Sequence, residues 1–448
     1  MNITKAWAAQ LDDYVIDLAW SPDGRLLAFA SAAGPITLFD AHGTRLCELP
    51  GHEDGTNTIA WAPTFQKSQV GGQRSEVGER ASEVESQKSE AGGRRSQVAG
   101  QRSEVGSQGS EVEGQWSKVG ATPVLASAVC PLSSDVCPPT SDIRPLASDG
   151  RPPTSGLLAS GGQDGKVRLW DASGGRQLSE TQSVPSAWVE RVQWKPRRAN
   201  TKPRIPNSKP QVPTPIFQAA NPDVLAAVAG RKLLFLNRDG AIIHTFPDAP
   251  KSLSALAWHP RGGAIGAACF GGVTLWDADD LRVQRQLPYS GAIQTLVWSP
   301  DGRWLVAGAQ DKAVHLWIPD EDLEFHMSGY ETKVGELSFS ADSRWLATGG
   351  SQDACVWDCS GAGPDGREPI PLPHSGRVCA VSFQHARRLL ATAANDGELA
   401  LWDITCGDPR VATVKLTAPV SIFAWSPDDT LLAVGSQKGG VLVLRVDA

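Results

Sequence analysis

Apolar and polar residues follow one recurring unit along the chain. Each copy has an apolar segment with an aromatic residue, a turn resembling Ser-Pro-Asp-Gly, a strand of apolar and small residues, a second turn that contains Asp, and a further apolar strand. The first copy runs from Val15 to Asp40. The aromatic residue, which we call the anchor, recurs at Trp20, Trp61, Trp194, Trp258, Trp298, Phe339, Phe383 and Trp425. The sequence therefore contains eight copies of the unit.

The spacing and the turn residues predict strands. Uninterrupted anchors lie about 40 to 44 residues apart, the length of one four-stranded propeller blade. The short segments are rich in Val, Leu, Ile and Trp, and turns such as Gln-Asp-Gly and Asn-Asp-Gly separate them. These turn residues tolerate positive φ and match the twist of a β-hairpin. Helical solenoids have repeats of similar length, but this pattern disfavours helices.

Two copies carry the motif in its most complete form. Residues 157–171 read Leu-Leu-Ala-Ser-Gly-Gly-Gln-Asp-Gly-Lys-Val-Arg-Leu-Trp-Asp, and residues 389–403 are closely similar. On these residues the chain resembles the WD-repeat (WD40) family, over about three quarters of its length. The resemblance implies an all-β fold, namely a single eight-bladed propeller of four-stranded antiparallel blades.

The two ends of the chain are expected to close the ring. The last copy stops after its third strand near Arg445, whereas a spare strand, residues 3–8, precedes the first copy. Pairing of the N-terminal strand with the last third strand would complete the eighth blade and hide exposed sheet edges. A seven-bladed ring with one appended copy remains an alternative. Eight blades are favoured because every copy retains its anchor.

The resemblance also implies a buried network that links His, Ser or Thr, Asp and Trp within a blade. The second copy offers His52, Ser160, Asp164 and Trp170, and the seventh offers His374, Thr392, Asp396 and Trp402. We interpret these residues as structural, because such bonds satisfy buried polar groups. In the fifth and sixth copies Tyr289 and Tyr330 take the His position. The third and eighth copies lack a Trp-Asp ending and are expected to depend on apolar packing.

Two insertions divide the predicted propeller. Residues 64–156 consist largely of tandem seven-residue units with one apolar residue each and frequent Gly, which argues against a coiled coil and predicts disorder. Residues 197–218 form a basic, Pro-rich loop that we expect to be solvated, with docking to an acidic partner or a membrane surface as an alternative. The propeller is assigned to residues 1–63, 157–196 and 219–448, with blades 3–8 in the last segment.

Both insertions fall between the first and second strands of a blade, so one face of the ring should be crowded and the other clear. The resemblance implies that peptides or protein partners bind on the clear rim. Aromatic residues and Arg dominate interface energetics. The candidate partner-binding residues are Tyr14, Trp188, Arg231, Tyr289, Lys312, Tyr330, Lys333 and Arg377.

Composition narrows the choice of function. A net charge of -7 and a pI near 5.7 argue against nucleic acid as a partner. The eight His residues are spread over several copies without metal-ligand spacing, and no phosphate loop or nucleophile motif is present. We therefore predict a protein-interaction scaffold, not an enzyme, with no catalytic, cofactor-binding or metal-binding residues. The alternatives are a regulatory or sensor subunit of a larger assembly and a propeller enzyme that acts on a small molecule at the central channel.

The compartment is predicted from three features. The eight cysteines form no CxxC pair, which favours buried thiols in a reducing compartment. The N-terminus lacks the apolar core of a signal peptide, and no segment approaches the roughly 18 apolar residues of a membrane span. We expect a cytoplasmic protein without a membrane partner.

Overall fold

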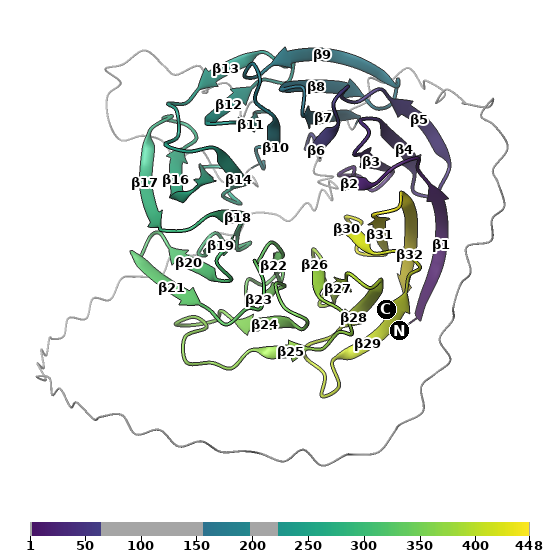
Figure 1. The fold of residues 1–448 in the computed structure, drawn as a ribbon, viewed down its shortest axis with the longest axis vertical. Helices are drawn as coiled ribbons and strands as arrows, with labels where there is room; N and C mark the ends of the chain where they lie inside the picture. Colours follow the sequence, from purple (N-terminus) through teal and green to yellow (C-terminus); the bar gives the residue numbers. More distant parts are fainter. Residues whose placement is uncertain (1, 64–155, 198–222, 448) are drawn as a thin grey trace, which may run out of the picture. The chain divides into compact units, whose positions relative to one another are not determined.

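A computed structural model describes residues 2–63, 156–197 and 223–447. In this part of the chain, eight four-stranded antiparallel sheets surround a central opening as the blades of a ring (Figure 1). The eight-bladed propeller predicted from the repeats is confirmed. The predicted disorder of the seven-residue units and the predicted solvated loop concern residues outside the described ranges.

Seven blades use their strands in chain order from the opening outward, and the eighth has β30, β31 and β32 followed by β1. The innermost strands are β2 (Val15–Trp20), β6 (Thr56–Trp61), β10 (Val189–Trp194), β14 (Leu253–Trp258), β18 (Ile293–Trp298), β22 (Leu337–Phe339), β26 (Val378–Phe383) and β30 (Val420–Trp425). The second strands are β3 (Leu26–Ser31), β7 (Leu157–Gly162), β11 (Leu225–Ala229), β15 (Ala264–Cys269), β19 (Leu305–Ala309), β23 (Trp345–Thr348), β27 (Leu390–Ala394) and β31 (Leu431–Ser436).

The outer half of each blade completes the sheet. The third strands are β4 (Ile36–Asp40), β8 (Lys166–Asp171), β12 (Lys232–Leu236), β16 (Gly271–Asp277), β20 (Val314–Ile318), β24 (Ala354–Asp358), β28 (Glu398–Trp402) and β32 (Gly440–Asp447). The outermost strands are β5 (Arg45–Leu49), β9 (Arg176–Gln182), β13 (Ile242–Thr245), β17 (Val283–Tyr289), β21 (Leu323–Met327), β25 (Ile370–Leu372), β29 (Arg410–Lys415) and β1 (Asn2–Gln10).

Burial explains the two kinds of strand pattern in the sequence. Both faces of a second strand pack against neighbouring blades, so every residue of β7 and of β11 is buried. An outermost strand such as β9 is mostly solvated and reads as polar. The apolar clusters lie between blades: one of them joins Leu157 and Leu169 of blade 2 to Val189 and Leu225 of blade 3. No blade could bury these surfaces alone.

The two ends of the chain close the ring, as predicted. Strand β1 pairs antiparallel with β32, from Asn2 opposite Asp447 to Gln10 opposite Gly440 (Figure 1). Trp7 of β1 also reaches blade 1, where its ring stacks on Phe39 at 5.1 Å between centroids. The N-terminal strand therefore contacts both blades at the closing seam.

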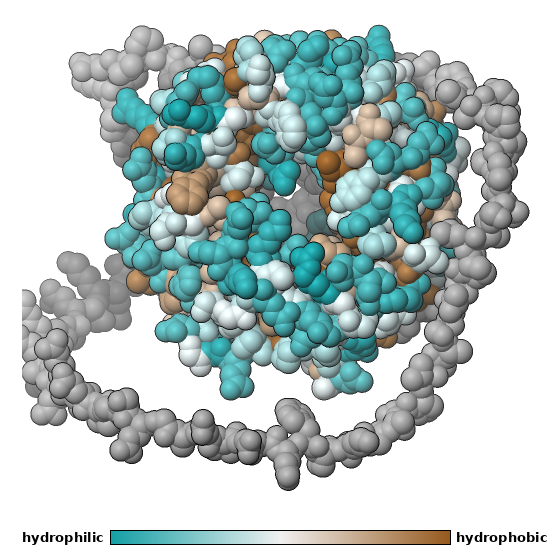
Figure 2. Space-filling view, viewed as in Figure 1, coloured by the Kyte–Doolittle hydropathy of each residue, from teal (hydrophilic) through white to brown (hydrophobic). Residues whose placement is uncertain are grey.

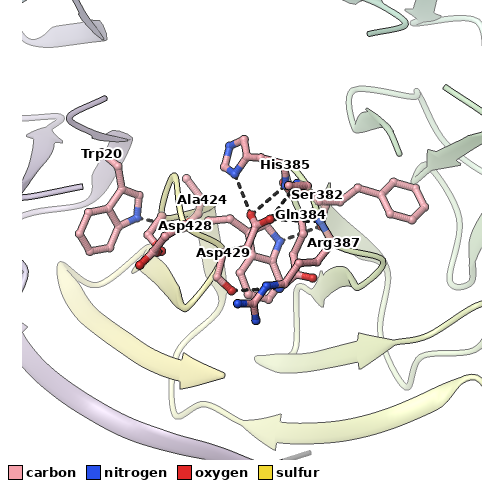
Figure 3. Close-up of polar contacts among 12 residues, drawn as sticks. Trp20, Ser382, Gln384, His385, Arg387, Ala424, Asp428 and Asp429 are labelled. Atoms are coloured by element: carbon pink, nitrogen blue, oxygen red, sulfur yellow. Dashed lines mark hydrogen bonds and ion pairs between the residues drawn. The ribbon is translucent and has the colours of Figure 1, made fainter. Parts of the chain in front are cut away.

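Hydrogen bonds from anchor indoles join most neighbouring blades. At six of the eight seams, the contacts between successive blades, the anchor Nε1–H donates to a backbone carbonyl oxygen of the preceding blade. These bonds are Trp20 to Ala424 (3.2 Å), Trp61 to Ala19 (2.9 Å), Trp194 to Ala60 (3.1 Å), Trp258 to Gln193 (3.0 Å), Trp298 to Ala257 (3.3 Å) and Trp425 to Ser382 (3.1 Å). Figure 3 shows the first of them. Blades 6 and 7 have Phe339 and Phe383 as anchors, which carry no such donor.

The ring has two rims, which we name by what they carry. The network rim consists of the turns that precede the first strands and those that join second to third strands. The insertion rim consists of the turns that join first to second strands and third to fourth strands. Residues 64–155 lie between β6 and β7, and residues 198–222 lie between β10 and β11, so the flanking strands end on the insertion rim in both cases. Among the described residues, no helix is long and apolar enough to cross a membrane.

Candidate functional site

Blade 2 carries a complete polar network beneath the network rim. His52, in the turn before β6, bonds through Nε2 to Ser160 Oγ and through Nδ1 to Asp164 Oδ1, each at 2.8 Å. The indole N–H of Trp170 donates to the same Ser160 Oγ at 2.8 Å. Burial lowers the pKa of His52, with Asp164 acting in the opposite direction. The four residues that the repeat pattern grouped are thus hydrogen bonded to one another.

The serine, histidine and aspartate of this network are spaced like a nucleophilic triad, but substrate has no access to them. Ser160 is 0% exposed and His52 1%. The Ser160 oxygen already accepts the Trp170 indole, and Arg168 donates to the Gly51 carbonyl above the site. A nucleophile must be reachable by its substrate. The arrangement therefore holds a blade together and cannot perform acyl transfer.

Blade 7 assembles its network differently from the residues proposed for it. His374 Nε2 and the Trp402 indole both bond to Thr392 Oγ1 at 2.6 Å. The carboxylate nearest to His374 Nδ1 is Glu398, at 3.5 Å, and not Asp396. Asp396 instead accepts the Ser375 hydroxyl at 2.5 Å and pairs with Lys415 Nζ at 2.8 Å. Glu398 lies at the buried start of β28, and this position brings its carboxylate toward the histidine.

Tyr289 and Tyr330 precede the first strands of blades 5 and 6, at the position where histidine precedes those of blades 2 and 7. Tyr289 donates to both carboxylate oxygens of Asp311, at 2.7 and 2.8 Å, and Tyr330 bonds to Thr348 Oγ1 at 3.1 Å. The two tyrosines are 8% and 7% exposed. Burial raises the pKa of both phenols. Both residues were also candidates for partner contact, but their place inside the blades leaves them only the structural role.

The other six partner-binding candidates lie on the network rim. Trp188 is 53% exposed in the turn before β10. Arg231, Lys312 and Lys333 are exposed in rim turns of blades 3, 5 and 6, whereas Tyr14 and Arg377 are half-buried beside the opening. Because these residues belong to different blades, the structure does not gather all six into one site. Figure 2 shows one face of the ring, where hydrophilic residues predominate around a central hollow.

The sequence pattern did not identify two further exposed residues on this rim. Phe270 is 55% exposed in the turn between β15 and β16, and Lys251 is exposed in the turn before β14. The corresponding turns of blades 2 and 7 read Gln163-Asp164-Gly165 and Asn395-Asp396-Gly397. A large apolar residue at such a turn is the signal that would have identified Phe270. We call Trp188, Arg231, Lys251 and Phe270 together the aromatic–basic strip.

The insertion rim has a built polar cluster of its own, between blades 7 and 8 (Figure 3). Asp429, in the turn after β30, accepts the backbone N–H of His385 at 2.8 Å, of Ala386 at 2.8 Å and of Arg387 at 3.2 Å, and it also bonds to His385 Nδ1 at 2.9 Å. Asp429 is 1% exposed. Its carboxylate fills a nest of backbone donors that would otherwise suit a bound anion. The cluster therefore joins two blades and offers no open site.

No group of three or more His, Cys, Asp or Glu side chains in the described ranges is placed to hold a metal ion. Six cysteines in these ranges are thiols outside any disulfide: Cys47, Cys269, Cys355, Cys359, Cys379 and Cys406. Burial raises the pKa of Cys355 and Cys379 to about 11, which keeps both thiols protonated at neutral pH. The network rim therefore presents exposed turns on a rigid framework.

Comparison with known proteins gives matches over parts of the chain. The family model for the anaphase-promoting complex subunit 4 WD40 domain matches residues 1–64. The model for the WD domain, G-beta repeat, matches residues 151–171, 283–317, 322–358 and 370–403. These matches cover strands of every blade except blade 3.

Three curated relatives align with less than half of the chain. Telomerase protein component 1 of Rattus norvegicus is 26% identical over 203 residues, which are 44% of this chain and 6% of that protein. The B-type cell cycle switch protein ccs52B of Medicago truncatula is 28% identical over 166 residues, 36% of this chain and 33% of that protein. The anaphase-promoting complex subunit cdc20 of Dictyostelium discoideum is 26% identical over 171 residues, 36% of this chain and 34% of that protein.

One solved structure matches the whole ring. The crystal structure of the computationally designed Ika8 protein has a TM-score of 0.60 and covers 98% of both chains. Its sequence identity is 15%, so the likeness concerns the fold alone.

Proposed function

Because the chain belongs to the WD40-repeat β-propeller family, we propose that it is a non-catalytic scaffold that binds peptides or protein partners on its network rim. The observation that carries this proposal is the contrast within that rim. His52 and His374 on this rim are hydrogen bonded in buried networks, whereas Trp188 and Phe270 extend into solvent from rigid turns. Exposed aromatic residues on a preorganised surface favour binding of another protein.

The test places a photo-crosslinking amino acid at single rim positions of the full chain in cells. Lys312 and Lys333 are exposed positions on the network rim, and His42 and Asp322 are matched exposed positions on the insertion rim. Proteins captured at the first pair and not at the second, identified by mass spectrometry, are the expected result. Capture only from His42 and Asp322 would contradict the proposed rim.

A second candidate function is a regulatory subunit of a larger assembly. It is favoured by the match of residues 1–64 to the anaphase-promoting complex subunit 4 model and by the similarity to a subunit of that complex. Co-migration of the endogenous protein with an assembly of several times its mass of 47.6 kDa on native gels would support this candidate. Migration as a single chain would remove it.

A cytoplasmic location belongs to the same proposal. Thiols outside disulfides among the described residues support a reducing compartment. Fractionation of cells that carry the untagged protein tests it, and recovery from a secretory or membrane fraction would be incompatible with it.

A further inference from the structure

The aromatic–basic strip is continuous along the network rim of blades 2 to 4. Ala187, next to Trp188, packs against the turn that holds Arg231: a Cβ placed on Gly230 would lie 3.1 Å from the Ala187 Cβ. The Ala249 N–H donates to the Arg231 carbonyl at 2.9 Å. Leu253, two residues after Lys251, lies opposite Cys269, the neighbour of Phe270. The four exposed side chains thus stand on adjoining turns.

The turns beneath the strip are held in place by the fold. Leu253 N–H donates to the Gly230 carbonyl at 2.7 Å, and Arg231 Nε donates to the Ala249 carbonyl at 2.6 Å. The two strands that carry Phe270 pair with each other up to the turn, with Cys269 opposite Gly272. A partner would therefore meet side chains whose backbone needs little further ordering, which lowers the entropic cost of binding.

The exposed aromatic residues of the strip differ from the other exposed apolar residues. The remaining large ones are aliphatic and lie singly on outermost strands: Leu178, Ile242, Val283 and Leu323. Scattered aliphatic residues are ordinary surface features. Two half-exposed aromatic rings at the two ends of a row of adjoining turns are side chains of the kind that dominate binding energy at interfaces.

Charge selects the kind of partner. At the network-rim ends of blades 3 and 4 the charged side chains are Glu190, Arg191, Arg231, Lys232, Asp248 and Lys251. Asp248 pairs with Lys232 at 2.5 Å, whereas Arg231 and Lys251 form no ion pair with a described residue. The strip is therefore net positive.

The neighbouring sector of the same rim, at the start of blades 1 and 2, is acidic. Asp12, Asp13, Glu53 and Asp54 are exposed in the turns before β2 and β6. A segment with negative charge is repelled there and attracted to blades 3 and 4. The distribution of charge along the rim therefore favours one binding place and one orientation for such a segment.

We infer that the aromatic–basic strip binds a protein segment that combines apolar side chains, which cover Trp188 and Phe270, with acidic residues that pair with Arg231 and Lys251. This inference rests on the proposed scaffold function and specifies the chemistry of the partner. The apolar side chains supply most of the affinity, and the carboxylates exclude neutral and basic segments.

The test is selection of a random twelve-residue peptide library, displayed on phage, against the full folded chain. The enriched peptides are expected to contain Leu, Phe or Trp together with Asp or Glu. A synthetic copy of the most enriched peptide should bind at least about tenfold more weakly to Trp188→Ala and to Phe270→Ala, because each change removes an aromatic contact. Leu178→Ala and Leu323→Ala, at exposed apolar positions off the strip, should leave its affinity unchanged.

A charge exchange separates this inference from a merely hydrophobic patch. Arg231→Glu combined with Lys251→Glu should abolish binding of the acidic peptide, and a peptide with Lys in place of its Asp and Glu should then bind the double variant. Absence of enrichment, enriched peptides without acidic residues, or unchanged affinity in the Trp188 and Phe270 variants would overturn the inference. Partners captured at Lys312 or Lys333 would still support the scaffold function in those cases.

Discussion

The seam between blades 1 and 2 and the seam between blades 5 and 6 join copies of the same unit by different means. At the first seam, the Trp61 indole donates to Ala19, and the Ile59 N–H donates to the Asp17 carboxylate at 2.8 Å. At the second seam the anchor is Phe339, and the bonds lie at the rims, such as Asp301 N–H to Ser343 Oγ at 2.9 Å. The middle of this seam depends on apolar packing.

Blades 2 and 6, which follow these two seams, also differ in how many hydrogen bonds stabilise them. Blade 2 has strands of six or seven residues and a complete His-Ser-Asp-Trp network. Blade 6 has three-residue first and last strands, and its Tyr330 and Trp357 share Thr348 without a carboxylate. The fold thus tolerates a weakened copy, since each blade is stabilised mainly by contacts with adjacent blades.

The largest loss of stability is expected when the ring is opened at the closing seam, between blades 8 and 1. Deletion of residues 1–10 removes β1, its pairing with β32 and the stacking of Trp7 on Phe39. We expect the loss of several kcal/mol and a fall in Tm of more than about 10 °C, because a buried edge and two apolar clusters become exposed. Differential scanning calorimetry measures the change. A Lys5→Gln variant serves as the control, and an unchanged Tm of the truncated chain would refute the closure.

Removal of the third-strand tryptophan should affect the two blades unequally. Trp170→Ala should lower the free energy of unfolding by about 3–5 kcal/mol, because the side chain is fully buried. Trp357→Ala should cost about 2 kcal/mol, because its side chain is half-buried. Urea unfolding followed by far-UV circular dichroism gives both values. Equal losses would mean that blade 6 is not the weaker copy.

The stability of the seam between blades 1 and 2 should depend on pH through the protonation of Asp17. Burial raises the pKa of this carboxyl to about 6, against the opposing effects of the Ile59 N–H and Arg191. Because the folded pKa lies above the unfolded one, the stabilising contribution is present below about pH 4 and is lost as pH rises through 6.

The variant Asp17→Asn keeps a side chain of the same size with an oxygen acceptor for the Ile59 N–H, but it has no carboxyl group to titrate. Between pH 4 and pH 7 the parent chain should lose about 2 kcal/mol relative to this variant. Thermal unfolding across that pH range measures the difference. Parallel pH profiles would contradict the assignment to Asp17.

Exchanging tryptophan and phenylalanine at two anchor positions should change the free energy of unfolding least. Trp61→Phe leaves the Ala19 carbonyl without its indole donor and should cost about 1–2 kcal/mol. The reverse change, Phe339→Trp, should add up to about 1 kcal/mol, since it supplies an indole N–H like that of the other anchors at a half-buried position. Urea midpoints of the two variants test the pair. A loss of stability in Phe339→Trp would show that this seam is set by ring size.

The sequence predicted the parts of the fold that depend on repetition. Eight anchors with regular spacing gave the blades, and the spare strand before Val15 gave the closure with β32. Position within the repeat also grouped His52, Ser160, Asp164 and Trp170, which share hydrogen bonds. These features are determined within one repeat or between adjacent repeats.

The features that were missed depend on contacts the repeat does not encode. In blade 7 two acidic residues, Asp396 and Glu398, stand two positions apart, and only the packed structure determines which approaches His374. In blade 5 Ala307 lies opposite Leu296, as Ser160 lies opposite Ile59 in blade 2, so the Trp317 indole has no hydroxyl to bond. Phe270 and Lys251 become neighbours only when two rim turns meet.

The antiparallel pairing of β1 with β32 has a mechanical consequence. Residues 2 and 447 lie opposite each other at one end of this strand pair, so handles attached to both would pull in opposite directions across the first hydrogen bonds. Such a load opens the ladder one bond at a time, like a zipper, whereas a load along the strands would stress all bonds together. Under tension between its ends, the ring should therefore yield first at the closing blade, and the seven remaining blades would unravel afterwards.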